Sequence, residues 1–377
     1  MANILYVGFY TLPDKEAAAN RVINNAKALR KAGNEVFFLD EQEACTYDFP
    51  ENEHNVLGFR TWSVQRPSNF RGLLKKMTSI KNVVMLIEKI NDIDAVIVYN
   101  YPSIAMFKLT NYCKKKNIKI ASDCTEWYSG KDYRFPMNIL SACDSFLRMR
   151  CIQKKLDGII AISKFLCNYY KKCENVIFVP PLVDKEDEIW RQERYEFDKQ
   201  KLNLVYTGNL GKSKEIFLPI IKALEESVNK NNIVLRIVGA TKEQFLELCP
   251  DAAEKLNDSI LFYGRVSHAE SLKILLSSDY MVFLREKNRV TMAGFSTKFV
   301  EAVSCGTSVI TNNTGDLKEY IQKLDCGYIL ENVIDLKSIF DKNITEMKKK
   351  NNLYDMNLFD YREYEDIFED WIEDMIK

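Results

Sequence analysis

The stretch "LNLVYTGNLGKSKE", residues 202–215, runs from an apolar segment into a glycine turn and then into two lysines. A strand that leads through a glycine turn into a helix is the repeating unit of parallel α/β sheets. Its Gly-Lys-Ser resembles the end of a nucleoside-triphosphate loop, but such a loop needs another glycine five positions before the Gly-Lys pair. Tyr206 stands there. The stretch therefore predicts a different kind of anion site at a strand end.

Short apolar runs and longer amphipathic segments alternate through most of the chain. The runs expected as strands are 3–9, 35–40, 94–100, 118–123, 157–163, 175–180, 202–208, 233–239, 259–264, 279–285 and 307–312. Apolar residues at helical spacing mark 17–33, 103–117 and 216–230 as helices between them. This alternation predicts parallel sheets that are covered by helices on both faces.

The length of the chain and a connector near its middle predict two domains. A chain of 377 residues is too long for one ordinary core, and two prolines with an acidic stretch at 179–188 are typical of a connector. The predicted division is 1–183, 184–355 and a C-terminal helix at 356–377. We expect one face of that helix to pack in a core; its apolar residues are Tyr361, Tyr364, Ile367, Phe368, Trp371, Ile372 and Met375.

The composition excludes several classes of site. Hydrophobic residues make up 46% and charged residues 28%, as in ordinary globular proteins. Ten cysteines contain no C-x-x-C pair, and there are only two histidines, so we expect free cytosolic thiols and neither a zinc site nor a disulfide framework. No apolar stretch approaches a membrane span, and the first residues are typical of a strand rather than of a signal peptide.

Three loops of the C-terminal half carry candidate binding residues, because ligands of open parallel sheets bind where strands end. In the first loop, Gly208 and Gly211 keep the turn open, while Lys212 and Lys214 can each place an ammonium near a phosphate. The alternative is an ordinary turn with lysines in solvent.

The second loop lies in "MAGFSTKFVEAVSCGTSVI", residues 292–310. Gly294 allows close approach of a ligand, Ser296 or Thr297 caps the following helix, and Lys298 adds charge beside the helix amides. Glu301, one turn later, can accept hydrogen bonds from two ribose hydroxyls. The alternative is a capped helix whose glutamate only complements the helix dipole.

The third candidate combines two polar loops that can hold a base or a sugar. Arg265 and Val266 follow one expected strand, and Arg285 ends another. His268 is nearby, and we assign it no chemistry. An Asp-x-Asp at 92–94 comes before a strand rather than after one, so we expect a connector there and not a metal site.

With these motifs, the chain resembles a GT-B glycosyltransferase of the large retaining family (family 4-like) that builds bacterial surface polysaccharides. The resemblance extends from "GFYTLPDKEAAANR" (8–21) to "AGFSTKFVEAVSCGTSVITN" (293–312), and the second of these is the most specific. It implies two Rossmann-like domains that face each other across a cleft, with the acceptor side in 1–183 and the nucleotide-sugar side in 184–355. The C-terminal helix then crosses back toward the N-terminal domain.

The resemblance also implies roles for individual residues. Lys214 falls where the family places a lysine on the donor diphosphate, and it is our catalytic candidate there. A companion arginine would fall at Asn209, which leaves one charge fewer. Ser296 and Thr297 correspond to residues that donate to phosphate oxygens, and Glu301 to the carboxylate that holds the ribose.

One departure concerns the family's pair of glutamates separated by seven residues. The second is Glu301, but Ala293 occupies the first position, which normally contacts the donor sugar. Backbone amides around Gly294 and Phe295 are expected to replace part of that contact.

In the N-terminal half, the resemblance places acceptor contacts in the loop from Gly8 to Arg21. It places a polar cluster at 122–128, where Glu126 is the acidic residue besides Asp123. We take Glu126 as the second catalytic candidate, in contact with a sugar near the reacting centre. The alternative is a surface carboxylate.

The predicted activity is metal-free transfer of a sugar, with retention, from a nucleotide-sugar to a hydroxyl of a glycan. No cofactor beyond that co-substrate is expected. The alternatives are a nucleotide-sugar epimerase on the same fold and a donor-binding subunit that has lost turnover, for which Ala293 is the hint. A nucleic-acid partner is not expected, since no aromatic–basic recognition motif is present.

Charge is distributed unevenly although the formal net charge is zero. Residues 66–172 hold 20 Lys/Arg against 8 Asp/Glu, whereas 351–377 hold 2 against 9. Two expected helical stretches, 70–90 and 137–155, combine apolar stripes with basic residues that include Lys75, Lys76, Arg148 and Arg150. We therefore predict that a cytoplasmic protein docks on the anionic inner face of a membrane, where it meets a lipid-linked acceptor.

Overall fold

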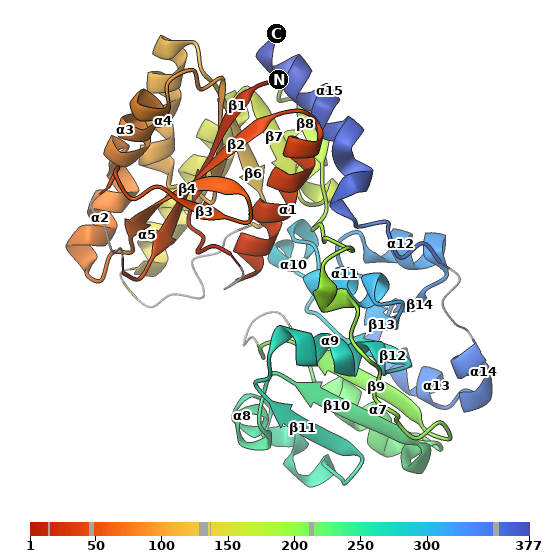
Figure 1. The fold of residues 1–377 in the computed structure, drawn as a ribbon. Coiled ribbons are helices and arrows are strands. Elements are labelled where there is room, and N and C mark those ends of the chain that lie inside the picture. The colour runs from red at the N-terminus through yellow and green to blue at the C-terminus, as the bar shows by residue number, and fades with distance from the viewer. Residues whose placement is uncertain (14–15, 45–48, 128–134, 136, 211–214, 350–353) are drawn as a thin grey trace. The chain divides into compact units, whose positions relative to one another are not determined.

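The computed structural model describes residues 1–377 except 14–15, 45–48, 128–134, 136, 211–214 and 350–353. The chain forms two compact units. Unit 1 contains Met1–Val183 and Asp360–Lys377, and unit 2 contains Asp184–Phe359. Each unit has its own sheet with helices packed on it (Figure 1).

The sheet of unit 1 has the order β3-β4-β2-β1-β5-β6-β7-β8, and every pairing is parallel except β3 with β4. Its strands are β1 (Asn3–Gly8), β2 (Glu35–Gln42), β3 (His54–Val56), β4 (Phe59–Gln65), β5 (Ala95–Tyr99), β6 (Lys119–Cys124), β7 (Gly158–Ala161) and β8 (Val176–Phe178). From β1 the chain continues to β2, β3 and β4 on one side, and it then crosses to β5 on the other side of β1. The carboxyl ends of β1 and β5 therefore flank the position where ligands of such sheets bind.

Helices cover both faces of this sheet, and β1 shows why. Ile4 and Tyr6 point into one buried cluster and Leu5 and Val7 into another, because alternate residues of a strand face opposite sides. The helices of unit 1 are α1 (Ala17–Lys31), α2 (Phe70–Thr78), α3 (Lys81–Ile90), α4 (Ser103–Lys116), α5 (Met137–Leu147), α6 (Lys164–Tyr170) and α15 (Glu365–Ile376).

The last helix, α15, packs on the N-terminal unit as the sequence predicted. Phe368, Trp371, Ile372 and Met375 share a buried cluster with α1 and β1. Ile367 is 38% exposed and lies outside that cluster, so its assignment to the buried face was wrong. The two segments that leave unit 1 pair with each other: Val183 forms a parallel bridge with Asp360.

Two features of unit 1 differ from expectation. The hairpin β3–β4 was not predicted; its two-residue turn, Leu57-Gly58, has both residues at positive φ (51° and 84°), which matches the twist of paired strands. The stretch 70–90 is two helices rather than one. The chain becomes extended at Ser79 (φ −96°, ψ 140°), which ends α2 before α3 begins.

The sheet of unit 2 has the order β11-β10-β9-β12-β13-β14 and is parallel throughout. Its strands are β9 (Leu202–Thr207), β10 (Ile233–Val238), β11 (Ile260–Gly264), β12 (Tyr280–Phe283), β13 (Ser308–Asn312) and β14 (Gly327–Leu330). Its helices are α7 (Leu218–Glu226), α8 (Lys242–Leu248), α9 (His268–Leu276), α10 (Arg289–Ala293), α11 (Thr297–Ser304), α12 (Leu317–Leu324), α13 (Leu336–Phe340) and α14 (Ile344–Lys349). The reversal of strand order lies between β9 and β12.

Candidate functional site

The loops that follow β9 and β12 meet at this reversal point of unit 2. Ile216 N–H donates to the Leu284 carbonyl at 2.9 Å, and Glu215 pairs with Arg285 in an isolated antiparallel bridge. The backbone of Arg285 is held in turn by the side chain of Asn312, which accepts from its N–H and donates to its carbonyl. Residues from three strand ends are thus fixed around one point.

Gly208 is a glycine because other groups approach it closely. Its φ is +126°, and a Cβ there would lie 2.7 Å from Lys298 Cε. Gly239 closes the other side, since a Cβ on it would lie 2.3 Å from the Gly208 carbonyl oxygen. Gly208 therefore leaves no room for a side chain of its own, because the Lys298 side chain occupies that space. Gly211, Lys212 and Lys214 lie outside the described residues.

The start of α11 forms as the sequence predicted. Ser296 is the N-cap, and its hydroxyl accepts from Phe299 N–H. Thr297 is the first helical residue. The amides of the first helical turn have no carbonyl partner within the helix and favour an anion. Lys298 is the second helical residue, and its side chain reaches Gly208.

One backbone expectation at the preceding loop changes. The Gly294 N–H donates to the Val290 carbonyl at 3.1 Å, so it ends α10 and is not available to a sugar. The side chain of Phe295 is buried, and its ring packs with those of Phe299, Tyr320 and Phe359. Ala293 is fully buried at the end of α10.

Lys298 forms an ion pair that the sequence analysis missed. Its Nζ lies 3.0 Å from Glu215 Oε1, and the two side chains are only 18% and 8% exposed. The same ammonium lies 5.4 Å from the centroid of the Tyr206 ring. Burial, and then the Glu215 carboxylate, raise the pKa of Tyr206 well above its ordinary value. Glu215 follows the two lysines directly, and no sequence signal linked it to a residue 83 positions away.

Glu301 also has a partner that was not predicted. His268 Nε2 lies 3.2 Å from Glu301 Oε1, and both side chains are partly exposed. His268 begins α9 behind the N-cap Ser267, which places it at the carboxyl edge of the sheet. A carboxylate with an imidazole beside it suits the hydroxyl groups of a ribose or sugar. His268 therefore joins the candidate site, although the sequence analysis gave it no role.

The remaining candidates of unit 2 lie at the same sheet edge. Asn209 is exposed, and its carbonyl accepts from the Tyr206 hydroxyl at 3.2 Å. Arg265 is exposed and Val266 half-buried just after β11. The Arg285 side chain is buried.

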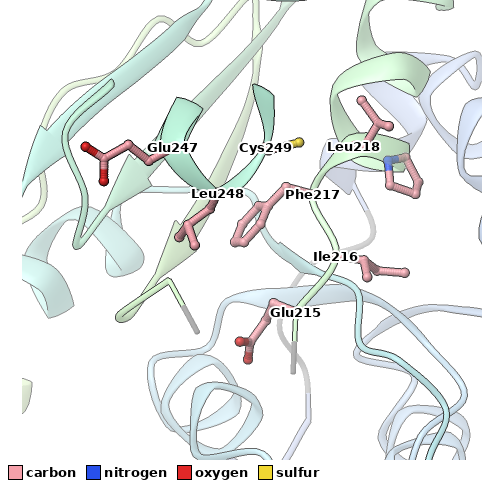
Figure 2. A pocket seen from close by; sticks show the side chains of 8 residues that line it. Glu215, Ile216, Phe217, Leu218, Glu247, Leu248 and Cys249 are labelled. Carbon is pink, nitrogen blue, oxygen red and sulfur yellow. The ribbon is translucent and has the colours of Figure 1, made fainter. Parts of the chain in front are cut away.

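A cavity of about 550 Å³ is lined in part by Glu215, which also belongs to the candidate site (Figure 2). It lies between the segment that leads into α7 and the end of α8. The lining residues are Glu215, Ile216, Phe217, Leu218, Pro219, Glu247, Leu248 and Cys249. Glu215 therefore contacts both the cavity and Lys298.

In unit 1, Gly8 and Arg21 were both expected to contact the acceptor, and they lie in different surroundings. Gly8 ends β1 and lies against β5: a Cβ there would be 2.4 Å from the Tyr99 carbonyl oxygen. Arg21 is buried, and its guanidinium binds the Asp123 carboxylate at 2.7 Å and the carbonyls of Val179 and Pro180. This placement corrects the prediction for Arg21. Its side chain stabilises the interior of unit 1 through these bonds and does not face an acceptor.

Asp123 is equally occupied inside unit 1. Its carboxylate accepts from Arg21, from the Tyr6 hydroxyl at 2.7 Å and from the Asn25 amide at 3.2 Å. Glu126, two residues beyond the end of β6, is half-buried at the carboxyl edge of the sheet. Glu126 therefore remains the candidate acidic group of that loop.

Lys76 belongs to a further cluster at this edge that was not predicted. Its Nζ lies 2.6 Å from the buried Glu41 carboxylate and 3.3 Å from the centroid of the Phe9 ring. Burial raises the pKa of Glu41 and lowers the pKa of Lys76. Arg148 is also buried. Both residues were expected on a membrane-facing surface, and both expectations were wrong.

Among the residues that the structure describes, no three His, Cys, Asp or Glu side chains come together to hold a metal ion.

Residues 187–356 match the family described as Glycosyl transferases group 1. The whole chain is similar to a sucrose-phosphate synthase from Thermosynechococcus elongatus, with a TM-score of 0.68, 14% identity and coverage of 100% of this chain and 97% of that one. It is similar to HepE of Anabaena in complex with UDP and glucose (TM-score 0.66, 14% identity, coverage 99% and 100%). It is also similar to WaaG, a glycosyltransferase involved in lipopolysaccharide biosynthesis (TM-score 0.60, 12% identity, coverage 99% and 99%). Comparison with curated protein sequences gives no match.

At these identities the structures establish the fold, which is GT-B. Together with the family match over unit 2, they support a GT-B glycosyltransferase.

Proposed function

We propose that this chain moves a sugar from a nucleoside-diphosphate donor to a hydroxyl of a glycan acceptor, with retention at the anomeric carbon and without a metal ion. The observation that carries the proposal is the convergence of Gly208, Lys298 and the N-terminus of α11 at the reversal point between β9 and β12. A diphosphate suits that arrangement, because the N-terminus of a helix favours an anion and the Lys298 ammonium, which is paired with Glu215, belongs to the same helix end. The UDP and glucose bound to HepE support a nucleotide-sugar donor.

In the proposed reaction, Lys298, Lys214 and the α11 amides stabilise the charge that develops on the leaving diphosphate. Glu301, with His268 beside it, accepts hydrogen bonds from the ribose hydroxyls, while Asn209, Arg265, Val266 and Lys212 lie along the donor. The departing phosphate takes the acceptor proton. No side chain of the chain then has to act as a strong general base.

On the acceptor side, we propose that Glu126 contacts the sugar near the reacting centre and that the edge around Gly8 receives the glycan. A lipid-linked acceptor in surface-polysaccharide synthesis agrees with the likeness to WaaG. The described cysteines are free thiols, which supports a reducing, cytoplasmic setting.

Calorimetric titration with UDP, GDP, ADP and their sugars tests the donor proposal. Glu301→Gln should weaken nucleotide binding by about 10- to 150-fold, because it removes a charged acceptor that contributes roughly 1.5–3 kcal/mol. Glu331→Gln, an exposed carboxylate of unit 2, is the matched control and should bind as the wild type does. If no nucleoside diphosphate binds, or if Glu301→Gln binds unchanged, the assignment is wrong.

A second candidate is a donor-binding subunit without turnover, which the buried Ala293 favours. Transfer to an added glycan, followed in the presence of a chelator, separates the two. We expect transfer that survives chelation. Binding without transfer or hydrolysis would favour the binding subunit, and an altered sugar released without any acceptor would favour an epimerase.

A further inference from the structure

Two helices of unit 1 leave much of their apolar surface exposed. α2 buries none of its residues, although it contains Phe70, Leu73, Leu74 and Met77. α5 buries only Ser145. A helix on a globular domain normally covers the core with its apolar side. These helices therefore present apolar area for which the described residues provide no cover.

The exposed side chains form one surface because the helices adjoin. α4 packs against both α2 and α5 (Figure 1). Lys108 on α4 donates to the Thr78 carbonyl at the end of α2, and Asp144 on α5 accepts from Ser103 N–H at the start of α4. We call this surface the α2/α4/α5 face. Its large apolar residues are 39–57% exposed: Phe70, Leu74, Ile104, Phe107, Ile139, Phe146 and Leu147.

The charged groups of this face are almost all basic. Asp144 is the acidic residue of the three helices, and it is half-buried and holds the α4 N-terminus. The exposed basic residues are Arg71, Lys75, Lys108, Lys114, Lys115, Lys116 and, just after α5, Arg150. The Arg150 guanidinium lies 5.0 Å from the centroid of the Phe146 ring, so charge and apolar area are in contact.

We propose that the α2/α4/α5 face docks on a membrane that carries anionic lipid headgroups. Exposed Phe, Ile and Leu side chains enter the boundary of the acyl chains while Lys and Arg remain with the phosphates. A second copy of the chain fits poorly, because a two-fold contact would bring this face against itself and place like charges together. None of the described helices is long and apolar enough to cross a bilayer. The contact is therefore peripheral.

Co-sedimentation with liposomes tests the proposal without any sugar donor, so its outcome is independent of the proposed reaction. The full chain should sediment with vesicles of phosphatidylcholine and phosphatidylglycerol and stay in solution with phosphatidylcholine alone. Added salt should release it. The double variant Lys75→Glu with Arg150→Glu should lose at least tenfold in vesicle affinity, because each basic residue near an anionic surface contributes about fivefold.

The apolar part of the face is tested by Phe70→Ser with Phe107→Ser, which should reduce binding by a similar factor. Matched controls lie in unit 2: Val228→Ser with Ile334→Ser for exposed apolar residues, and Lys222→Glu with Lys323→Glu for exposed charges. All variants alter exposed side chains and should keep the wild-type melting temperature. Controls that lose binding as strongly as the face variants would overturn the proposal.

Two further results would also overturn it. One is equal recovery in the supernatant with neutral and anionic vesicles. The other is self-association in sedimentation velocity that Phe70→Ser with Phe107→Ser abolishes, which would assign the face to a second copy of the chain.

Discussion

At the scale of single residues, the pair of Lys298 and Glu215 controls how much positive charge the candidate site offers. The pair is largely buried, and its Nζ–Oε1 distance is 3.0 Å. A diphosphate beside Gly208 therefore meets an ammonium that a carboxylate already neutralises. Buried charges that lose their partner interact more strongly with whatever anion replaces it.

Glu215→Gln should for this reason bind inorganic pyrophosphate about 5- to 30-fold more tightly than the wild type, as expected for about 1–2 kcal/mol of restored attraction. Lys298→Ala should instead weaken binding and turnover by about 10- to 1000-fold. Titration calorimetry with pyrophosphate measures both variants. Weaker binding by Glu215→Gln would show that the carboxylate positions Lys298 rather than competing with the ligand.

A matched control is the pair of Lys318 and Glu331 in the same unit, whose side chains are 42% and 59% exposed. Exposed ion pairs contribute little. Lys318→Ala should leave pyrophosphate affinity unchanged.

At the scale of elements, the packing of the β9 turn against the turn after β10 and against α11 depends on two glycines. Gly208 and Gly239 both have positive φ, and a Cβ on either would come within 2.7 Å of another group. Non-bonded atoms do not approach so closely, so a Cβ on Gly239 would displace the backbone at Gly208, whereas a Cβ on Gly208 would displace the Lys298 side chain.

Gly208→Ala should lower the free energy of unfolding by roughly 1–3 kcal/mol and weaken nucleotide binding, since it displaces both the turn and Lys298. Gly33→Ala is the control: Gly33 has φ +80° but nothing within 4 Å of a Cβ. That variant should cost about 1 kcal/mol of stability and leave binding intact. Denaturant unfolding and titration measure the two effects, and equal nucleotide affinity for both variants would contradict the assignment of Gly208.

At the scale of the whole molecule, the two units have separate cores, and the last helix belongs to the first of them. Trp371 is buried, donates from Nε1 to the Asn175 carbonyl at 2.7 Å and packs so closely on Gly158 that a Cβ there would lie 2.8 Å from its ring. The contacts join the C-terminal helix to β7 and to the residue before β8.

Trp371→Ala should therefore destabilise unit 1 by roughly 3–5 kcal/mol, the usual cost of truncating a large buried aromatic residue. Scanning calorimetry should resolve two transitions, and a bound nucleotide should raise only that of unit 2. Trp371→Ala lowers the other transition. Phe340→Ala, at a fully buried position of unit 2, should do the reverse. A shift of both transitions by either variant would indicate a single cooperative unit.

Much of the fold could be predicted from local pattern. The expected strands and the cap at Ser296 were found, because the spacing of apolar residues and the chemistry of helix ends are short-range properties. The β3–β4 hairpin was missed because its turn is Leu57-Gly58 rather than the usual Asn-Gly. The break at Ser79 was missed because the apolar spacing continues across it.

The candidate site was only half predictable. Local patterns were enough to predict the parallel α/β class and the glycines and helix cap where an anion can bind, since a strand, a turn and a helix carry their signals within a few residues. The tertiary structure was needed to show which charged side chains are paired or buried. Glu215 pairs with Lys298 and His268 with Glu301. In unit 1, Arg21 and Arg148 are buried, and Lys76 pairs with the buried Glu41. The physical reason is that the order of strands in a sheet brings together side chains far apart in the chain, and no local pattern encodes that order.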